Sequence, residues 1–376
     1  MVTMPAGAAE SDQPCEAGVT QKIGDPSAAR NLTQLGFPET WKIATGKGVR
    51  VAVVDSGVNA SNLHLTNAVE KGRSLVGGDA RQDDFGHGTA VAGIIAARRV
   101  DGSVLVGAAP DATIIPVRTY QKVPDTAGLA QGIRWAADQE ADVINVSVST
   151  GPNDPALPQL RAAVKYAVSS DAVIVASGGN QGELAPLTQK RFPAALPGVI
   201  GVAATRANGT VDDWSIHGPQ NDVAAPGENV LITYLGDGDC LAGSNGRAYT
   251  SWATAYVSGL AADLRQEFPD ATAEEISNRI LDTASRPVRS KRDDVQGWGV
   301  IQPYAALTTS GSNKPGTTQA DEVKSVRGGI DPLDLHSDPM QPSRTAMLWW
   351  AIGSLGVAGV ALVLRPWIRA LRKERT

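Results

Sequence analysis

The chain has 376 residues, 42% of them hydrophobic and 19% charged, which suits one large globular domain with extensions. Its formal net charge is −5, from 34 basic and 39 acidic residues. Five of the basic residues and one acid lie in the last dozen positions, which leaves 29 basic against 38 acidic residues in the body. An acidic body without a basic stripe argues against nucleic acid as a partner.

Residues 1–45 form a polar, irregular extension with one helix-like stretch that ends in FPETW. The opening letters MVTMPAGAAESDQP contain no apolar core of a secretory signal. Cys15 in this extension and Cys240 are the two cysteines of the chain, so only one pairing is available. In an oxidising compartment that disulfide would join the extension to the loop before Ser251; two unrelated thiols are the alternative.

Residues 46–308 alternate apolar strands with helical segments, which predicts an α/β fold with a parallel sheet covered by helices on both faces. Continuous apolar runs are typical of parallel strands buried on both faces. The five runs are VRVAVVD, ATIIPVRTY, DVINVSVS, DAVIVAS and GVIGVAA. Helices are predicted over Thr89–Ala97, Ala127–Gln139, Leu160–Val168, Ala253–Phe268 and Ala273–Ala284. The last of these follows Thr272, with Glu275 three positions on, which predicts a capping box.

The sequence predicts that the C-terminal part consists of a spacer, a membrane helix and a basic tail. Residues 309–344 are rich in Gly, Ser, Thr, Pro and Asp without periodicity, which predicts a flexible linker. Ala346–Leu364 is a run of 19 residues without a charge, long enough to span a bilayer, so we predict a single transmembrane helix over 345–365. Residues 366–376 are rich in arginine and form the expected cytoplasmic tail.

This orientation puts the body outside the cytoplasm, anchored to the cell membrane by one C-terminal helix. Export needs a signal that this sequence does not display, and the simplest reconciliation is a start codon assigned too late or a sequence given without its signal. The alternative is a tail-anchored protein whose body lies in the cytosol.

Three short blocks carry the chemistry, in the order Asp, His, Ser: VAVVDSGVN around Asp55, FGHGTAVAGIIAA around His87 and YTSWATAYVSG around Ser251. A serine hydroxyl needs a base within reach, and that base needs a buried carboxylate to hold its tautomer. This chain order is one of the known solutions to that problem. Of four histidines, only His87 lies between glycines at the mouth of a predicted helix. We therefore predict that Asp55 orients His87, His87 is general base and then acid, and Ser251 attacks.

A tetrahedral intermediate also needs hydrogen-bond donors aimed at its oxyanion. In VIVASGGNQG, Asn180 follows an apolar strand on a glycine-flanked turn, where its amide can project. We predict that Asn180 and the backbone N–H of Ser251 are the two donors. The alternative is a turn asparagine in a left-handed conformation, which asparagine adopts readily.

From about Gly46 to Leu307 these blocks resemble the subtilisin superfamily (S8 family) of serine proteases. VGAAPDATIIPVR, ADVINVSVS, FPAALPGVIGVAAT and WSIHGPQNDVAAPG extend the resemblance. Within it, ETWKIATGKGVRVAVVDSGVN, the spacer and the tail helix are similar to mycosins, the membrane-anchored proteases of type VII secretion. The resemblance implies an endopeptidase that takes protein or peptide substrates and associates with type VII secretion membrane-complex subunits. It also implies that Ser147, Val148 and Ser149 bind an extended peptide through their backbone.

No cofactor is expected. Some subtilisin relatives bind calcium, but no loop here has a dense carboxylate pattern at the spacing of a recognised site, so calcium and other metals are not indicated.

The serine block departs from the family pattern, which has Gly-Thr-Ser at this point and a proline four residues after the serine. Tyr249 and Ala255 stand at those positions. A tyrosine there predicts a narrowed cleft, and glycine's backbone freedom is lost. The second hypothesis is therefore a weakly active or inactive protease-like subunit that stabilises a membrane secretion complex. A non-proteolytic acyl hydrolase is disfavoured because the G-x-S-x-G elbow and its Ser-first order are missing.

Overall fold

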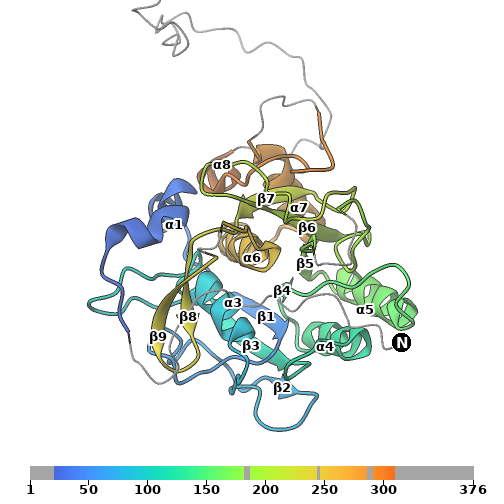
Figure 1. The fold of residues 1–376 in the computed structure, drawn as a ribbon, viewed down its shortest axis with the longest axis horizontal. Helices are drawn as coiled ribbons and strands as arrows, with labels where there is room; N and C mark the ends of the chain where they lie inside the picture. The colour runs from blue at the N-terminus through green and yellow to red at the C-terminus, as the bar shows by residue number, and fades with distance from the viewer. Residues whose placement is uncertain (1–20, 182–186, 244–245, 286–290, 310–376) are drawn as a thin grey trace, which may run out of the picture. The chain divides into compact units, whose positions relative to one another are not determined.

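A seven-stranded parallel sheet organises the computed structural model, which describes residues 21–181, 187–243, 246–285 and 291–309 (Figure 1). The strand order is β2-β3-β1-β4-β5-β6-β7, and every neighbouring pair is parallel. The strands are β1 (Arg50–Asp55), β2 (Arg73–Ser74), β3 (Thr113–Arg118), β4 (Val143–Val146), β5 (Val173–Ser177), β6 (Val199–Thr205) and β7 (Val223–Pro226). The chain leaves β1 on one side to form β3 and returns on the other side to form β4. The strand order therefore reverses direction beside β1, and open α/β sheets bind ligands at the carboxyl ends of the strands at such a point.

Helices cover both faces of this sheet, as the alternation of apolar runs and helical patterns predicts. Val51 and Val53 belong to one core cluster, which also holds residues of α3 (His87–Ala96) and α6 (Thr250–Glu267). Ala52 and Val54 belong to the opposite cluster, with residues of α4 (Thr126–Asp138) and α5 (Leu157–Ser169). Successive strand side chains point to opposite faces, so one buried strand supplies both cores.

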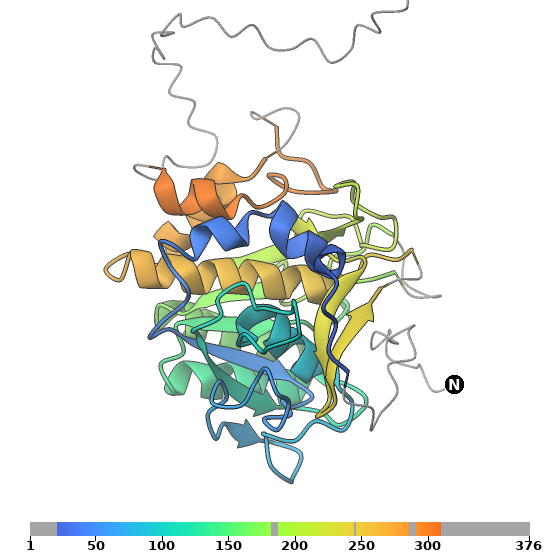
Figure 2. The same ribbon diagram turned by 90° about the vertical axis from the view of Figure 1, so that its left-hand side faces the viewer.

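The long helix α6 lies between the sheet and a further layer of short helices (Figure 2). That layer joins the N-terminal part of the described chain to its end, because residues of both pack into the α3/α6 core cluster. Its members are η1 (Pro26–Ala29), α1 (Arg30–Gln34), α2 (Phe37–Thr40), α7 (Ala273–Thr283) and α8 (Pro303–Thr308). The helix that carries Ser251 is therefore buried along most of its length.

The five strands predicted from the sequence are confirmed as β1, β3, β4, β5 and β6, and the capping box is present. Glu275 Oε2 accepts the Thr272 N–H at 2.8 Å, and the Thr272 hydroxyl accepts the Glu275 N–H at 3.3 Å. Strand β7 and the antiparallel hairpin of β8 (Val230–Tyr234) and β9 (Gly238–Ala242) were not predicted. These strands have only four or five residues, β7 ends in Pro226 and β9 begins with Gly238, so their apolar runs do not stand out.

Several predicted segments lie outside the described residues: the linker from 310 onward, the transmembrane helix over 345–365, the basic tail and Cys15. Within the described ranges, no helix combines the length and apolar character needed to span a bilayer. Cys240 is buried on β9, and its pairing with Cys15 stays a prediction.

Helix α6 passes so close to the chain before β3 that one of its positions must lack a side chain. A Cβ on Gly259 would lie 2.4 Å from the Cβ of Ala108, which is itself fully buried. We expect Gly259→Ala to lower the free energy of unfolding by about 1–3 kcal/mol, despite alanine's better helix propensity.

Exchanging the two residues provides the control. Gly259→Ala combined with Ala108→Gly removes the atom that the new methyl group meets, so chemical denaturation should show most of the lost stability regained. If the two single losses simply add, the close contact is not their cause.

Candidate active site

Asp55 is the last residue of β1, at the carboxyl end of the central part of the sheet, and is fully buried. Its Oδ1 accepts three hydrogen bonds: from the Ser56 N–H (2.8 Å), from His87 Nδ1 (2.8 Å) and from the Tyr120 hydroxyl (2.7 Å). Among the described residues, its Oδ2 has no hydrogen-bond partner. Burial opposes ionisation, but the charge and hydrogen bond of His87, with those of Tyr120 and Ser56, hold the pKa of Asp55 below its ordinary value.

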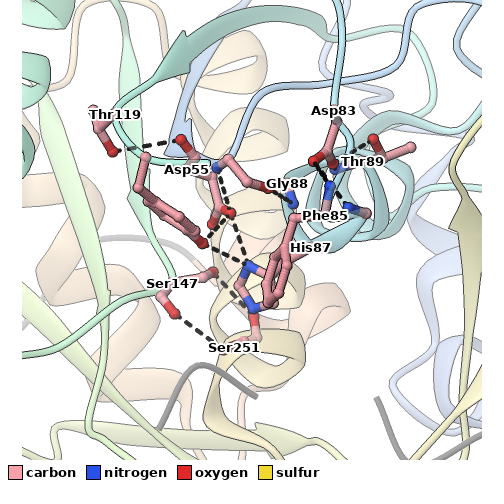
Figure 3. A network of polar contacts seen from close by, with 12 residues as sticks. Asp55, Asp83, Phe85, His87, Gly88, Thr89, Thr119, Ser147 and Ser251 are labelled. Carbon is pink, nitrogen blue, oxygen red and sulfur yellow. Dashed lines mark hydrogen bonds and ion pairs between the residues drawn. The ribbon is translucent and has the colours of Figure 1, made fainter. Parts of the chain in front are cut away.

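His87 is the first residue of α3, and the residues around it fix where that helix begins (Figure 3). Asp83 Oδ1 accepts the N–H groups of Phe85 and Gly86 (3.1 and 2.9 Å), and its Oδ2 accepts the N–H of Thr89 (2.9 Å). These are donors that a helix start leaves unpaired. Asp83 therefore holds the first turn, and with it the backbone of His87.

The glycine after His87 is required by a close backbone approach. A Cβ on Gly88 would lie 2.1 Å from the carbonyl oxygen of Gly57 and 3.1 Å from the Cβ of Asp55. The Gly88 N–H donates to the Ser56 hydroxyl at 3.0 Å, which ties the helix start to the residue after Asp55. The G-H-G pattern thus lets α3 approach the end of β1 closely enough for the Asp55–His87 hydrogen bond.

The imidazole of His87 is held in one tautomer. Since Asp55 is an acceptor, Nδ1 carries the proton, and Nε2 is left with the lone pair that a base requires. Burial lowers the pKa of His87, but the Asp55 charge and hydrogen bond outweigh it and raise that pKa above the ordinary value. The rings of Trp252 and Phe85 flank the imidazole, with centroids 5.2 and 6.4 Å away.

A second histidine–carboxylate pair lacks this property. His64 Nε2 lies 2.7 Å from Asp239, and its Nδ1 lies 2.7 Å from the carbonyl oxygen of Arg98. Both ring nitrogens face acceptors, so neither offers a lone pair to a serine. Its fully buried side chain ties the loop before α3 to β9.

Ser251 is the second residue of α6 and lies beside the imidazole of His87 (Figure 3). Its hydroxyl donates to the carbonyl oxygen of Ser147 at 3.0 Å, and the Ser147 hydroxyl donates to the Ser251 carbonyl at 3.2 Å. In the described part of the chain, no hydrogen bond joins His87 Nε2 to this hydroxyl. Such bonds are often long in unliganded enzymes and shorten when substrate binds.

Asn180 follows β5, and its orientation is fixed by the residue before the serine. Its Oδ1 accepts the backbone N–H of Thr250 at 3.0 Å and the Thr250 hydroxyl at 2.9 Å. An N–H group can only donate, so the amide oxygen must point to Thr250 and the NH₂ group must point elsewhere. The alternative of a left-handed turn asparagine is wrong, because Gly179 carries the positive φ (99°) and Asn180 does not.

The two unusual neighbours of the serine are both buried. The Tyr249 ring packs edge-on against Trp214, with centroids 6.2 Å apart. Tyr249 belongs to the α3/α6 core cluster and is only 3% exposed to solvent. The expected narrowing of the cleft is not supported, because this ring lies in the core. Ala255 is fully buried in the second turn of α6.

The remaining predicted residues follow β4. Ser147, Val148 and Ser149 lie directly beyond the end of that strand, and Ser147 bonds to Ser251 as described above. The described residues contain no group of three or more His, Cys, Asp or Glu side chains placed to hold a metal ion.

Three residues near the site were missed from the sequence: Tyr120, Trp252 and Asp83. Tyr120 comes two residues after β3, and the register pairs Asp55 with Arg118 across β1 and β3. An aromatic hydroxyl just past the end of the strand beside Asp55 was the available signal. Trp252 follows the serine directly, but nothing local shows that its ring would reach an imidazole on another helix.

The fold and the site together define a class of enzyme. An aspartate–imidazole pair beside a buried serine, all at the carboxyl edge of a parallel sheet, is the constellation of a serine hydrolase.

The chain belongs to the subtilase family of serine endopeptidases, whose sequence model matches residues 46–299. Mycosin-4 of Mycobacterium tuberculosis is 34% identical over 362 residues, covering 82% of this chain and 77% of that protein. The crystal structure of MycP1 from Mycobacterium smegmatis has a TM-score of 0.69 and 31% identity, covering 81% and 92% of the two chains. A chain of the periplasmic assembly from the ESX-5 inner membrane complex has a TM-score of 0.66 and 30% identity, covering 81% and 89%.

Proposed function

We propose that this protein is a membrane-anchored endopeptidase that cleaves substrates or components of a type VII secretion system, with Asp55, His87 and Ser251 as its triad. The observation that carries the proposal is the 2.8 Å hydrogen bond from His87 Nδ1 to the buried Asp55, beside Ser251. The membrane anchor rests on the uncharged run Ala346–Leu364 and the basic tail after it. The secretion role rests on the likeness to mycosins and to a chain of the ESX-5 assembly.

In the proposed mechanism, the Ser251 hydroxyl turns from the Ser147 carbonyl to His87 Nε2 as substrate binds. Nε2 takes the proton while Oγ forms a bond to the scissile carbonyl carbon, and Asp55 stabilises the imidazolium. The resulting oxyanion accepts hydrogen bonds from the Asn180 NH₂ group and from the Ser251 N–H, which the first turn of α6 leaves unpaired. His87 then gives its proton to the leaving amine, and water hydrolyses the acyl-enzyme by the same steps in reverse order.

A fluorophosphonate probe tests the chemistry, because it bonds only to an activated serine. We expect the full-length protein, solubilised in detergent, to label at Ser251, and the folded Ser251→Ala variant to stay unlabelled. Equal labelling of the two proteins would remove the triad proposal.

A separate experiment determines on which side of the membrane the body of the protein lies. A membrane-impermeant amine reagent should modify exposed body lysines such as Lys22 and Lys47 in intact cells. Modification only after the cells are lysed would favour the cytosolic, tail-anchored alternative.

A structural role within a secretion complex is the second candidate, favoured by the likeness to a chain of the ESX-5 periplasmic assembly. The Ser251→Ala variant separates the two roles. A purely structural subunit would support secretion with this variant as well as with the wild type, whereas a protease would not.

The Tyr120 hydroxyl competes with His87 for the same carboxylate oxygen, so it should tune the base. We expect Tyr120→Phe to leave more of the Asp55 charge to the imidazole and to raise the pKa of His87. Since the base acts when neutral, the acidic limb of the kcat/KM profile should move to higher pH, by about half a unit.

Tyr166→Phe is the matched control, because the exposed Tyr166 hydroxyl also donates to an aspartate, Asp138, at 2.7 Å. It should leave the profile unchanged. An unmoved acidic limb in Tyr120→Phe would mean that this hydroxyl only fills space.

A further inference from the structure

Arg191 is a buried arginine that has no partner of opposite charge among the described residues. It is 4% exposed, and its guanidinium donates to the Ser149 hydroxyl (3.2 Å), the Ser149 carbonyl (2.9 Å) and the side-chain oxygen of Gln189 (3.3 Å). All three acceptors are neutral. In the described part of the chain, no carboxylate forms an ion pair with it, whereas the buried Arg118 has Asp84 at 2.9 Å.

Such an arrangement is costly unless a counter-charge arrives. An arginine side chain stays protonated even when buried, and an isolated cation in a poorly solvated site is destabilising. Burial is the cause that lowers the pKa of Arg191. Of its five N–H groups, three are used by the acceptors named above, which leaves one on each terminal nitrogen. Two such N–H groups are suited to bind a carboxylate with both its oxygens.

The guanidinium lies between the two segments that flank the nucleophile. A Cβ on Gly179 would lie 2.7 Å from Arg191 Cγ and 3.1 Å from its Nε, so the side chain runs along the turn before Asn180. On its other side, Thr150 and Phe192 exchange backbone hydrogen bonds of 2.8 and 3.0 Å, which places Arg191 against the segment after β4.

One segment contacts Ser251 itself, and the other contacts the residue before it. The Ser147 carbonyl accepts the Ser251 hydroxyl, and Asn180 accepts the N–H of Thr250. The proposed site for the scissile carbonyl, at Ser251 and Asn180, therefore adjoins both segments between which the Arg191 guanidinium lies.

We infer that Arg191 determines specificity, and that the protease prefers Asp or Glu at the substrate residue whose carbonyl is attacked. The inference rests on the proposed function, because it uses the same serine and the same orientation of the peptide. The carboxylate of that residue supplies the counter-charge that no described residue of the chain gives Arg191.

Matched peptides that differ only by Glu or Gln before the scissile bond test the inference on the unmodified full-length protein. We expect kcat/KM to be about 10- to 100-fold higher for Glu, the range of a charge-assisted hydrogen bond. Arg191→Gln should reduce this ratio to about 1, and Arg191→Lys should retain part of it. Arg161→Gln is the control, because the Arg161 guanidinium stacks on the neighbouring Phe192 ring, 4.8 Å from its centroid; it should keep the wild-type ratio.

The outcomes separate this inference from the proposed function. A wild type that labels with fluorophosphonate at Ser251 but cleaves both peptides equally overturns the inference and leaves the triad intact. A wild type that accepts only small residues, and large ones after Arg191→Gln, would show a steric role and overturn it too. The acid Glu183 lies outside the described residues. If the Glu preference appears only in Glu183→Gln, the chain supplies its own counter-charge and the inference fails.

Discussion

Replacing Asp55 by alanine is expected to lower kcat about 10⁴-fold while leaving KM nearly unchanged. The change leaves three donors around one oxygen position without an acceptor: the Ser56 N–H, His87 Nδ1 and the Tyr120 hydroxyl. The imidazole then loses both its fixed tautomer and the charge that stabilises its protonated form. Steady-state hydrolysis of a peptide by the detergent-solubilised protein measures the effect.

The Asp55→Asn variant distinguishes the effect of the fixed His87 tautomer from the effect of the Asp55 charge. Because Ser56 and Tyr120 both present donors, the asparagine oxygen is expected to take the place of Oδ1 and to keep Nδ1 protonated. Only the charge is lost, so kcat should fall about 10- to 100-fold, less than in Asp55→Ala. Since Asp55 raises the pKa of His87, removing the charge should move the acidic limb of kcat/KM to lower pH. Equal losses in the two variants would contradict this account of the tautomer.

Asn180→Ala is expected to lower kcat by about 10²- to 10³-fold, the usual cost of one oxyanion donor, with little change in KM. The NH₂ group of Asn180 becomes important only when the carbonyl oxygen gains charge, so ground-state binding should be nearly unaffected. Alanine also removes the acceptor for the Thr250 N–H, and this structural loss must be separated from the catalytic one.

Asn180→Asp makes that separation. The aspartate keeps an oxygen for the Thr250 N–H and hydroxyl, at 3.0 and 2.9 Å in the native side chain, but has no donor and adds a negative charge beside the oxyanion. We expect its kcat to be at least as low as that of Asn180→Ala, with native thermal stability. Recovery of activity in Asn180→Asp would show that Asn180 only supports Thr250.

The sequence was informative where one short segment contains both the residue and the reason for its position. Val51 to Val54 are buried on both faces, so an unbroken apolar run ending in Asp55 predicts a central strand with a carboxylate at its end. The glycine after His87 likewise reports a local constraint, since the helix start approaches the Gly57 carbonyl. Backbone conformation and strand burial depend on a few neighbouring residues, so a short stretch of sequence is enough to predict them.

The tertiary structure decided the contacts between distant segments. The sequence gives no local sign that the Tyr120 hydroxyl reaches Asp55 or that Trp252 packs on His87, and it suggested that Tyr249 would narrow the cleft. The direction of the Asn180 amide and the burial of Arg191 likewise depend on segments that meet only after the strands take their order. The sequence by itself determined five of the seven strands of the parallel sheet, the helices that cover its two faces and the four residues of the proposed chemistry. Packing of side chains far apart in the chain decided what surrounds them, because each such contact depends on the conformation of both segments at once.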